Sequence, residues 1–139
     1  MNREIKFRAY DEYNNEMYIV DNLSFEDGLM IKVDMFNDYF EPEEMILMQY
    51  TGLKDKNGVE IYEGDIIKFI DDYDEFEDRD IYEIGVIQNY DKIYKNESDE
   101  SSFPNCDYYF SKHLEDYYSE CEVIGNVWEN GELLKESEE

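Results

Sequence analysis

The chain has 139 residues, of which 38 are acidic and 12 are basic, and its formal net charge at pH 7 is -26. Apolar residues make up 42% and aromatic residues 17% of the chain, and a disordered acidic tail has far fewer aromatic side chains. The shortage of Lys and Arg excludes direct binding to nucleic-acid phosphates and to anionic membranes, because both depend on basic side chains.

The first 50 residues predict a series of short strands. Apolar and polar residues alternate over 5–10, which is the period of a half-buried strand. An Asn14-Asn15 turn then leads into a second apolar stretch, so residues 5–20 are predicted to form a hairpin. Two further strands are expected over 29–33 and 45–50.

The segment 53–69 predicts a tight hairpin followed by a sharp corner. Its Asn57-Gly58 pair is a strong turn signal, since both residues tolerate the positive φ that a tight hairpin requires. Gly64-Asp65 marks the corner before the apolar residues 66–69. Short strands joined by glycine corners favour a small, strongly bent sheet or barrel.

The second half of the chain predicts another strand pair and one helix. The strands are expected over 84–90 and 121–128, with Gly85 and Gly125 as bulges. A short helix is expected over 111–118, with the serine at its start as N-cap. We therefore expect a mainly β fold with one short helix.

The length suits a single domain over 1–139, or two small lobes. The stretch 71–80, DDYDEFEDRD, carries seven acids and one Arg, and a second acidic stretch covers 97–122. Both lie in the weakly patterned region between the expected strands. We therefore interpret them as loops, the first as an acidic insertion.

Two cysteines, Cys106 and Cys121, are too few for a disulfide scaffold and have no metal-binding spacing. Reduced thiols in a cytosolic protein are the expectation. The N-terminus lacks the apolar region of a signal peptide, and the longest apolar run, over 45–48, is far short of a membrane span. A soluble, cytoplasmic protein of the host bacterium is expected.

Three segments of the chain resemble the YopX family of phage and prophage proteins: IKFRAYD (5–11), MQYTGLKDKNGVEIYEGDIIKF (48–69) and EVIGNVWEN (122–130). The resemblance implies an SH3-like β-roll and implies no enzymatic activity, cofactor or catalytic residue. The chain departs from the family at Tyr10, where members tend to have Trp, and at Gly131, where they tend to have Pro. The acidic stretch lies outside the matched segments.

The residues predict no catalytic or metal site and no cofactor. A calcium-loop spacing of acids begins at Asp72, but Phe76 and Glu77 stand where an EF-hand needs an oxygen ligand and a glycine. Adventitious cation binding by the acidic residues stays open. The single histidine, His113, has Asp116 one helical turn away, but a second histidine that would complete a zinc set is missing from the sequence.

The charge indicates a function. A net charge of about 2 to 8 is enough to keep a small domain soluble, so -26 is a large excess. Rows of carboxylates can occupy the cationic cleft of a nucleic-acid-binding protein, and the expected function is inhibition of such a partner by nucleic-acid mimicry. The alternative is an oligomeric structural or assembly module of a phage, with acidity serving solubility only.

Exposed aromatic residues among the acids are expected to anchor this interface. The predicted partner-binding residues are Asp71, Asp72, Asp74, Glu75, Phe76, Glu77, Asp78, Asp80, Asp99, Glu100, Glu115 and Asp116.

Overall fold

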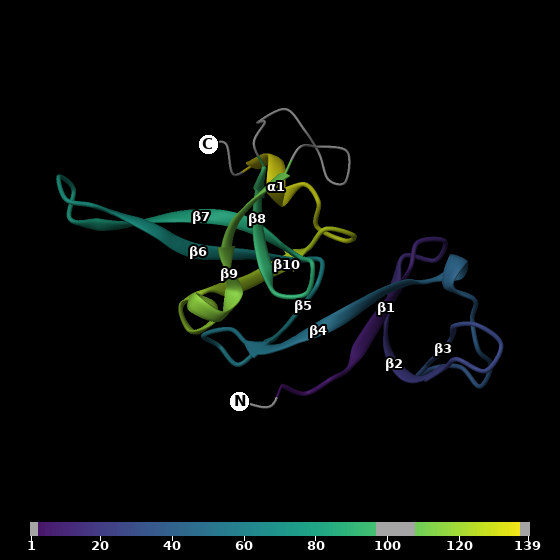
Figure 1. Cartoon of the computed structure of the whole chain (residues 1–139). Helices are drawn as coiled ribbons and strands as arrows, with labels where there is room; N and C mark the ends of the chain where they lie inside the picture. The colour runs from purple at the N-terminus through teal and green to yellow at the C-terminus, as the bar shows by residue number, and fades with distance from the viewer. Residues whose placement is uncertain (1–2, 97–107, 137–139) are drawn as a thin grey trace.

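The structure, a computed structural model, describes residues 3–96 and 108–136 and consists mainly of β-strands (Figure 1). The strands form two antiparallel sheets of five strands each. The predicted mainly β fold is confirmed. Within the described part of the chain both sheets are open, so the bent-sheet form of the prediction describes them and a closed barrel does not.

The N-terminal sheet has the strand order β3-β2-β1-β4-β5. Its strands are β1 (Phe7–Asp11), β2 (Glu16–Ser24), β3 (Met30–Val33), β4 (Ile46–Lys54) and β5 (Glu60–Tyr62). These strands confirm the predicted hairpin and the two strands expected after it. Ala9, Ile31, Val33 and Met45 form the buried centre of this lobe. A short 3-10 helix, η1 (Pro42–Glu44), leads into β4.

The C-terminal sheet has the strand order β10-β6-β7-β8-β9. Its strands are β6 (Asp65–Asp74), β7 (Arg79–Gln88), β8 (Lys92–Asn96), β9 (Tyr108–His113) and β10 (Glu122–Asn126). A four-residue helix, α1 (Leu133–Glu136), follows. Both faces of β6 are covered at its start, since Ile66 packs with Val127 and Leu134 while Ile67 packs with Ile87 and Leu114.

The structure corrects the predicted pair of strands over 84–90 and 121–128. Strands β7 and β10 do not pair with each other, because β6 lies between them. Gly125 does lie at a register shift of the β10–β6 pairing, as predicted. Gly85 is not a bulge, since its register with β6 is regular. A Cβ atom at Gly85 would lie 2.5 Å from Cγ2 of Ile93, so the glycine allows close packing.

The helix predicted over 111–118 is also wrong in its placement. Residues 112 and 113 pair with β8 as the end of β9, because the exposed edge of β8 offers backbone partners that a helix would leave unused. Two 3-10 turns follow, η2 (Leu114–Asp116) and η3 (Tyr118–Glu120). Leu114 of the predicted helix is fully buried in the core of this lobe.

The two lobes join at the predicted corner of Gly64. This glycine has a φ of +88°, a value that L side chains rarely adopt. Its N–H donates to the carbonyl of Ile87 at 2.7 Å, and its own carbonyl accepts from the N–H of Val127 at 2.9 Å. The chain therefore passes from β5 to β6 through a glycine whose backbone is hydrogen-bonded to β7, at Ile87, and to Val127, the residue after β10.

Candidate interaction site

The β6–β7 hairpin extends away from the rest of the molecule, as Figure 1 shows. We call its outer part, residues 71–80, the acidic arm. The arm is a paired hairpin, with Tyr73 opposite Asp80 and Asp74 opposite Arg79, and a turn over 75–78 closes it. The loop predicted for these residues is therefore wrong. Carboxylate side chains do not prevent backbone pairing between adjacent strands.

Local hydrogen bonds hold the turn of the acidic arm. The carboxylate of Asp74 accepts from the N–H of Phe76 at 2.9 Å and from the N–H of Glu77 at 3.3 Å. Asp78 adopts a φ of +53°, which a short polar side chain tolerates better than most. The hydroxyl of Tyr73 donates to the carboxylate of Asp78. The acids thus shape the turn as well as charge it.

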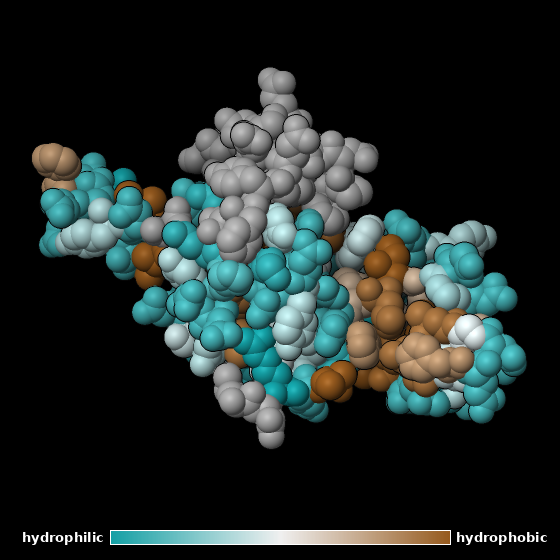
Figure 2. Space-filling view, viewed as in Figure 1, coloured by the Kyte–Doolittle hydropathy of each residue, from teal (hydrophilic) through white to brown (hydrophobic). Residues whose placement is uncertain are grey.

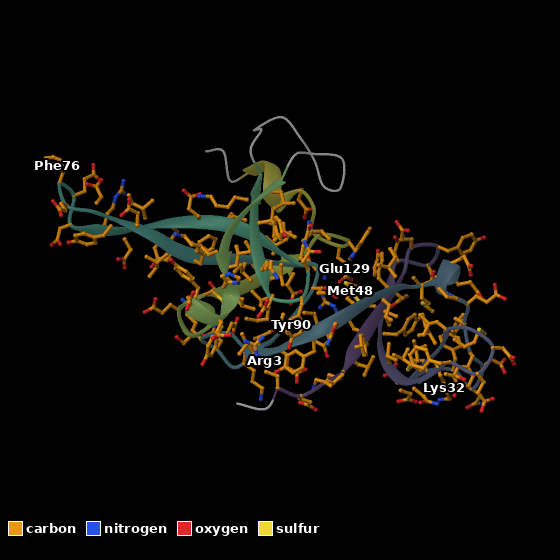
Figure 3. The ribbon with its side chains drawn as sticks, in the orientation of Figure 1. Arg3, Lys32, Met48, Phe76, Tyr90 and Glu129 are labelled. Atoms are coloured by element: carbon orange, nitrogen blue, oxygen red, sulfur yellow. The ribbon has the colours of Figure 1, made fainter. Side chains whose placement is uncertain are left out.

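The acidic arm presents an aromatic side chain at its tip. Phe76 is 100% exposed, and Figure 3 shows it at the far end of the hairpin. Tyr73 and Tyr82 are about half exposed along the arm and at its base. Exposed aromatic residues are enriched among the energetically important residues of protein interfaces. The tip therefore combines an apolar anchor with surrounding charge.

The charge of the arm is nearly uncompensated. Six acids fall within 72–80, where Arg79 is the single basic residue. The Arg79 guanidinium lies 2.9 Å from the carboxylate of Glu77, and both side chains are exposed. An exposed ion pair of this kind contributes little to the stability of the fold. Asp72 and Asp74 share one face of β6, where same-face residues lie about 6.6 Å apart, and Glu75, Glu77 and Asp78 lie in the turn.

The structure does not bring all the predicted partner-binding residues to the arm. Eight of the predicted residues lie on it: Asp71, Asp72, Asp74, Glu75, Phe76, Glu77, Asp78 and Asp80. Asp99 and Glu100 lie outside the described residues. Glu115 and Asp116 lie in η2, where the carboxylate of Glu115 is 2.9 Å from the guanidinium of Arg3. Arg3 also binds Asp91, beyond the other end of β7, about 30 Å from the arm by strand length.

Tyr117 and Tyr118, aromatic residues among acids in the sequence, pack against the core of the C-terminal lobe. Both side chains are half-buried, and they lie in η3 and just before it, away from the acidic arm. The ring of Tyr117 meets that of Phe69 edge-on, with centroids 5.7 Å apart.

Neither a metal-ligating cluster nor an activated thiol is found among the described residues. Among them, no group of three or more His, Cys, Asp or Glu side chains is placed to hold a metal ion. Burial raises the pKa of the Cys121 thiol to about 12, so this side chain is a neutral thiol at neutral pH and a poor nucleophile. No helix in the described ranges is long and apolar enough to cross a membrane.

The structure explains the three sequence segments that carry the family resemblance. They meet at the junction of the two lobes, where the Arg8 guanidinium binds the carboxylate of Asp65 at 2.8 Å and lies over the ring of Tyr62. The rings of Tyr10 and Trp128 stack with centroids 6.0 Å apart. These side chains hold the sheets together, so the segments are structural and the acidic arm lies outside them.

The comparisons with known proteins agree with this fold. A family model described as YopX protein matches residues 6–135. No curated protein matches the chain. The crystal structure of protein EF1440 from Enterococcus faecalis is similar, with a TM-score of 0.52 and 24% sequence identity, over 96% of this chain and 99% of that one. At that identity the likeness concerns the fold alone.

Proposed function

The chain belongs to the YopX family, and on that premise we propose that it is a non-catalytic acidic protein that binds a basic nucleic-acid-binding protein, occupies its nucleic-acid cleft and inhibits it. The family resemblance places such proteins in phages, so a host defence nuclease is a suitable target class. One observation carries the proposal: the acidic arm projects from the body with Phe76 at its tip.

The shape of the arm suits a cleft. A two-stranded ribbon is narrow enough to enter the space that a nucleic-acid strand would occupy. Its exposed acids are Asp72 and Asp80 on the strands and Glu75, Glu77 and Asp78 in the turn. Complementary fields accelerate association by about ten- to a thousandfold, and this gain falls steeply with salt. The arm therefore supplies fast encounter through its charge and a contact point through Phe76.

The test compares two variants that lose the same number of charges. The arm variant carries Glu75→Gln, Glu77→Gln, Asp78→Asn and Asp80→Asn. The lobe control carries Glu26→Gln, Asp27→Asn, Asp34→Asn and Asp38→Asn, all exposed residues of the N-terminal lobe. Each protein is immobilised, exposed to bacterial lysate at low salt and eluted with duplex DNA. The eluted proteins are identified, purified and assayed for DNA binding or cleavage with the chain added.

We expect wild type and the lobe control to capture the same DNA-binding protein and to inhibit its DNA binding, and the arm variant to lose at least about tenfold in inhibitory potency. Equal losses in both variants would mean that net charge alone causes the capture. Captured proteins that duplex DNA does not release would contradict the mimic proposal.

A second candidate, an oligomeric assembly module, is favoured by a different observation. The segment after β2 exposes four large hydrophobic side chains, Phe25, Met35, Phe36 and Tyr39, and Figure 2 shows hydrophobic surface gathered on the N-terminal lobe. Light scattering with size-exclusion chromatography tests it. A concentration-independent monomer would reject this candidate, and an oligomer that Met35→Ser and Phe36→Ser together dissociate would support it.

A further inference from the structure

A groove in the N-terminal lobe lies between the β1–β2 turn and η1, which Figure 1 shows next to each other, at the opposite side of the molecule from the acidic arm. Its volume is about 660 Å³, within the usual range of about 300 to 1,000 Å³ for ligand sites. Its walls come from three separate segments, residues 10–14, residue 40 and residues 43–46.

The lining of the groove combines aromatic rings with carboxylates. Tyr13 and Phe40 supply the accessible rings and Ile46 adds aliphatic surface, while Tyr10 and Met45, which are 3% and 5% exposed, form the floor. The carboxylates are those of Asp11, Glu12, Glu43 and Glu44, and the lining includes no Lys, Arg or His. Burial, followed by the nearby charges of Glu129 and Glu12, raises the pKa of the Tyr10 hydroxyl. A negative potential therefore extends to the aromatic wall.

Two of the four carboxylates are already engaged by the protein. Asp11 accepts from the backbone N–H groups of Tyr13 and Asn14 at 2.9 and 3.2 Å, and Glu44 accepts from the N–H of Glu41 at 3.0 Å. Within the described ranges, the side chains of Glu12 and Glu43 have no hydrogen bond or ion pair, and both are exposed. The fixed pair shapes the two walls, and the other pair is available to a ligand.

We propose that this groove binds the side chain of an arginine that projects from a segment of a partner protein. A guanidinium group has a flat face that stacks on aromatic rings and N–H groups that bind carboxylates, so it matches both parts of the lining. Its aliphatic stem fits against Ile46, which is half-buried. Tyr13, which is 93% exposed at the rim, supplies a ring that can cover the guanidinium at little cost to the fold.

Charge complementarity selects this occupant over the others. An anionic segment would meet four carboxylates without a compensating base, and a neutral side chain would gain no charge-assisted bond from Glu12 or Glu43. A lysine satisfies the charge but lacks the flat face, so it binds more weakly. The inference goes beyond the proposed function, because the groove shares no residue with the arm and either can fail without the other.

The experiment uses the whole chain and two short probes. The first probe is the capped peptide Gly-Gly-Arg-Gly-Arg-Gly-Gly, and the second has citrulline, the neutral isostere, in place of each arginine. Backbone amide NMR shifts follow the titration, and Trp128 fluorescence follows it independently, since Trp128 is the single tryptophan and its ring stacks on Tyr10.

We expect saturable binding of the arginine peptide, with the largest shifts in residues 10–14 and 43–46. The groove variant, Glu12→Gln with Glu43→Gln, should lose at least about tenfold in affinity, the effect of charge-assisted bonds to a cation. Tyr13→Ala should also weaken binding, by at least about threefold. The matched control, Glu75→Gln with Glu77→Gln on the arm, removes the same charge and should stay within twofold of wild type.

Three outcomes would overturn the proposal. Equal losses in the groove variant and the arm control would mean that the peptide follows net charge. Equal affinity for the citrulline peptide would remove the role of the guanidinium. Shifts spread over both lobes without saturation would show that the groove is not a site.

Discussion

The guanidinium of Arg8 lies 2.8 Å from the carboxylate of Asp65 and thereby joins a strand of the N-terminal sheet to the first strand of the C-terminal sheet. Both side chains are nearly buried, at 12% and 3% exposure. The same guanidinium donates to the carbonyl of Glu63 at 3.2 Å, and Asp65 also accepts from the N–H of Tyr62 at 2.8 Å. The two residues thus hold the corner where the lobes meet.

Arg8→Ala should destabilise the protein by about 3 to 5 kcal/mol, because it leaves the buried carboxylate of Asp65 without its ionic partner. Urea denaturation at pH 7 measures the loss. The double variant with Asp65→Asn should recover part of it, since the buried charge is then gone. Lys32→Ala, which breaks the exposed pair with Asp21, is the control and should cost less than about 1 kcal/mol. A cost this small for Arg8→Ala would contradict the role of the pair.

The destabilisation by Arg8→Ala should become smaller as the pH falls. Burial raises the pKa of Asp65 above its ordinary value of 3.8, and Arg8 opposes this shift. Without Arg8 the folded state binds a proton at Asp65 more tightly than the unfolded state does, so lowering the pH from neutral toward 4 favours folding of the variant relative to wild type. Urea denaturation at pH 7 and pH 5 checks the sign, and a larger loss at pH 5 would contradict it.

Much of the fold is predictable because local signals mark it. The hairpin over 5–20 follows from alternation and an asparagine turn, and the corner at Gly64 follows from a glycine between two apolar stretches. The positive φ of Gly58 and of Gly64 confirms why glycine stands at both. Such features depend on neighbours in sequence, so the sequence alone indicates them.

The features that the sequence did not reveal depend on distant contacts. The sequence suggests a bulge at Gly85, but a glycine stands there because the side chain of Ile93 on the next strand leaves no room for a Cβ atom. The acidic arm lacks apolar alternation, so the sequence does not predict its strands. The groove takes its lining from segments about 30 residues apart, and Glu43 carries no signal that pairs it with Glu12.

Gly85→Ala should destabilise the protein by about 1 to 3 kcal/mol through overpacking, since its Cβ would lie 2.5 Å from Cγ2 of Ile93. Combining it with Ile93→Ala should cost less than the sum of the two single changes, because the second removes the clashing methyl group. Chemical denaturation of the four proteins in the cycle measures this coupling. Gly85→Ala with Ile31→Ala in the N-terminal core is the control and should be additive. Additivity in the first cycle would mean that the strands shift to accept the methyl group.

Cys121 should resist alkylation while the protein is folded. Burial raises the pKa of its thiol from 9.0 to about 12, which lowers the thiolate fraction at pH 8 by about a thousandfold. In a Cys106→Ser background, iodoacetamide should label Cys121 rapidly in urea and very slowly without it, as mass spectrometry will show. Because the folded state favours the neutral thiol, deprotonation opposes folding, so stability should fall as the pH rises from 9 toward 12. Rapid labelling of the folded protein would contradict the burial.

Added salt should stabilise the protein, contrary to the behaviour expected of a fold held by surface ion pairs. At a net charge of -26 repulsion among carboxylates opposes the compact state, and raising NaCl from 0.01 to 1 M shortens the screening length from about 30 to about 3 Å. The melting temperature should therefore rise across this range. An arm variant with Glu75→Gln, Glu77→Gln and Asp80→Asn should leave the free energy of unfolding within about 0.5 kcal/mol of wild type or raise it, because exposed substitutions of this kind cost little. It should also reduce the effect of salt on the melting temperature. The control variant with Glu26→Gln, Asp27→Asn and Asp34→Asn removes the same charge from less crowded positions, so it should reduce the effect of salt less. A melting temperature that falls with salt would contradict this prediction, because it would mean that attraction between charges outweighs repulsion on this surface.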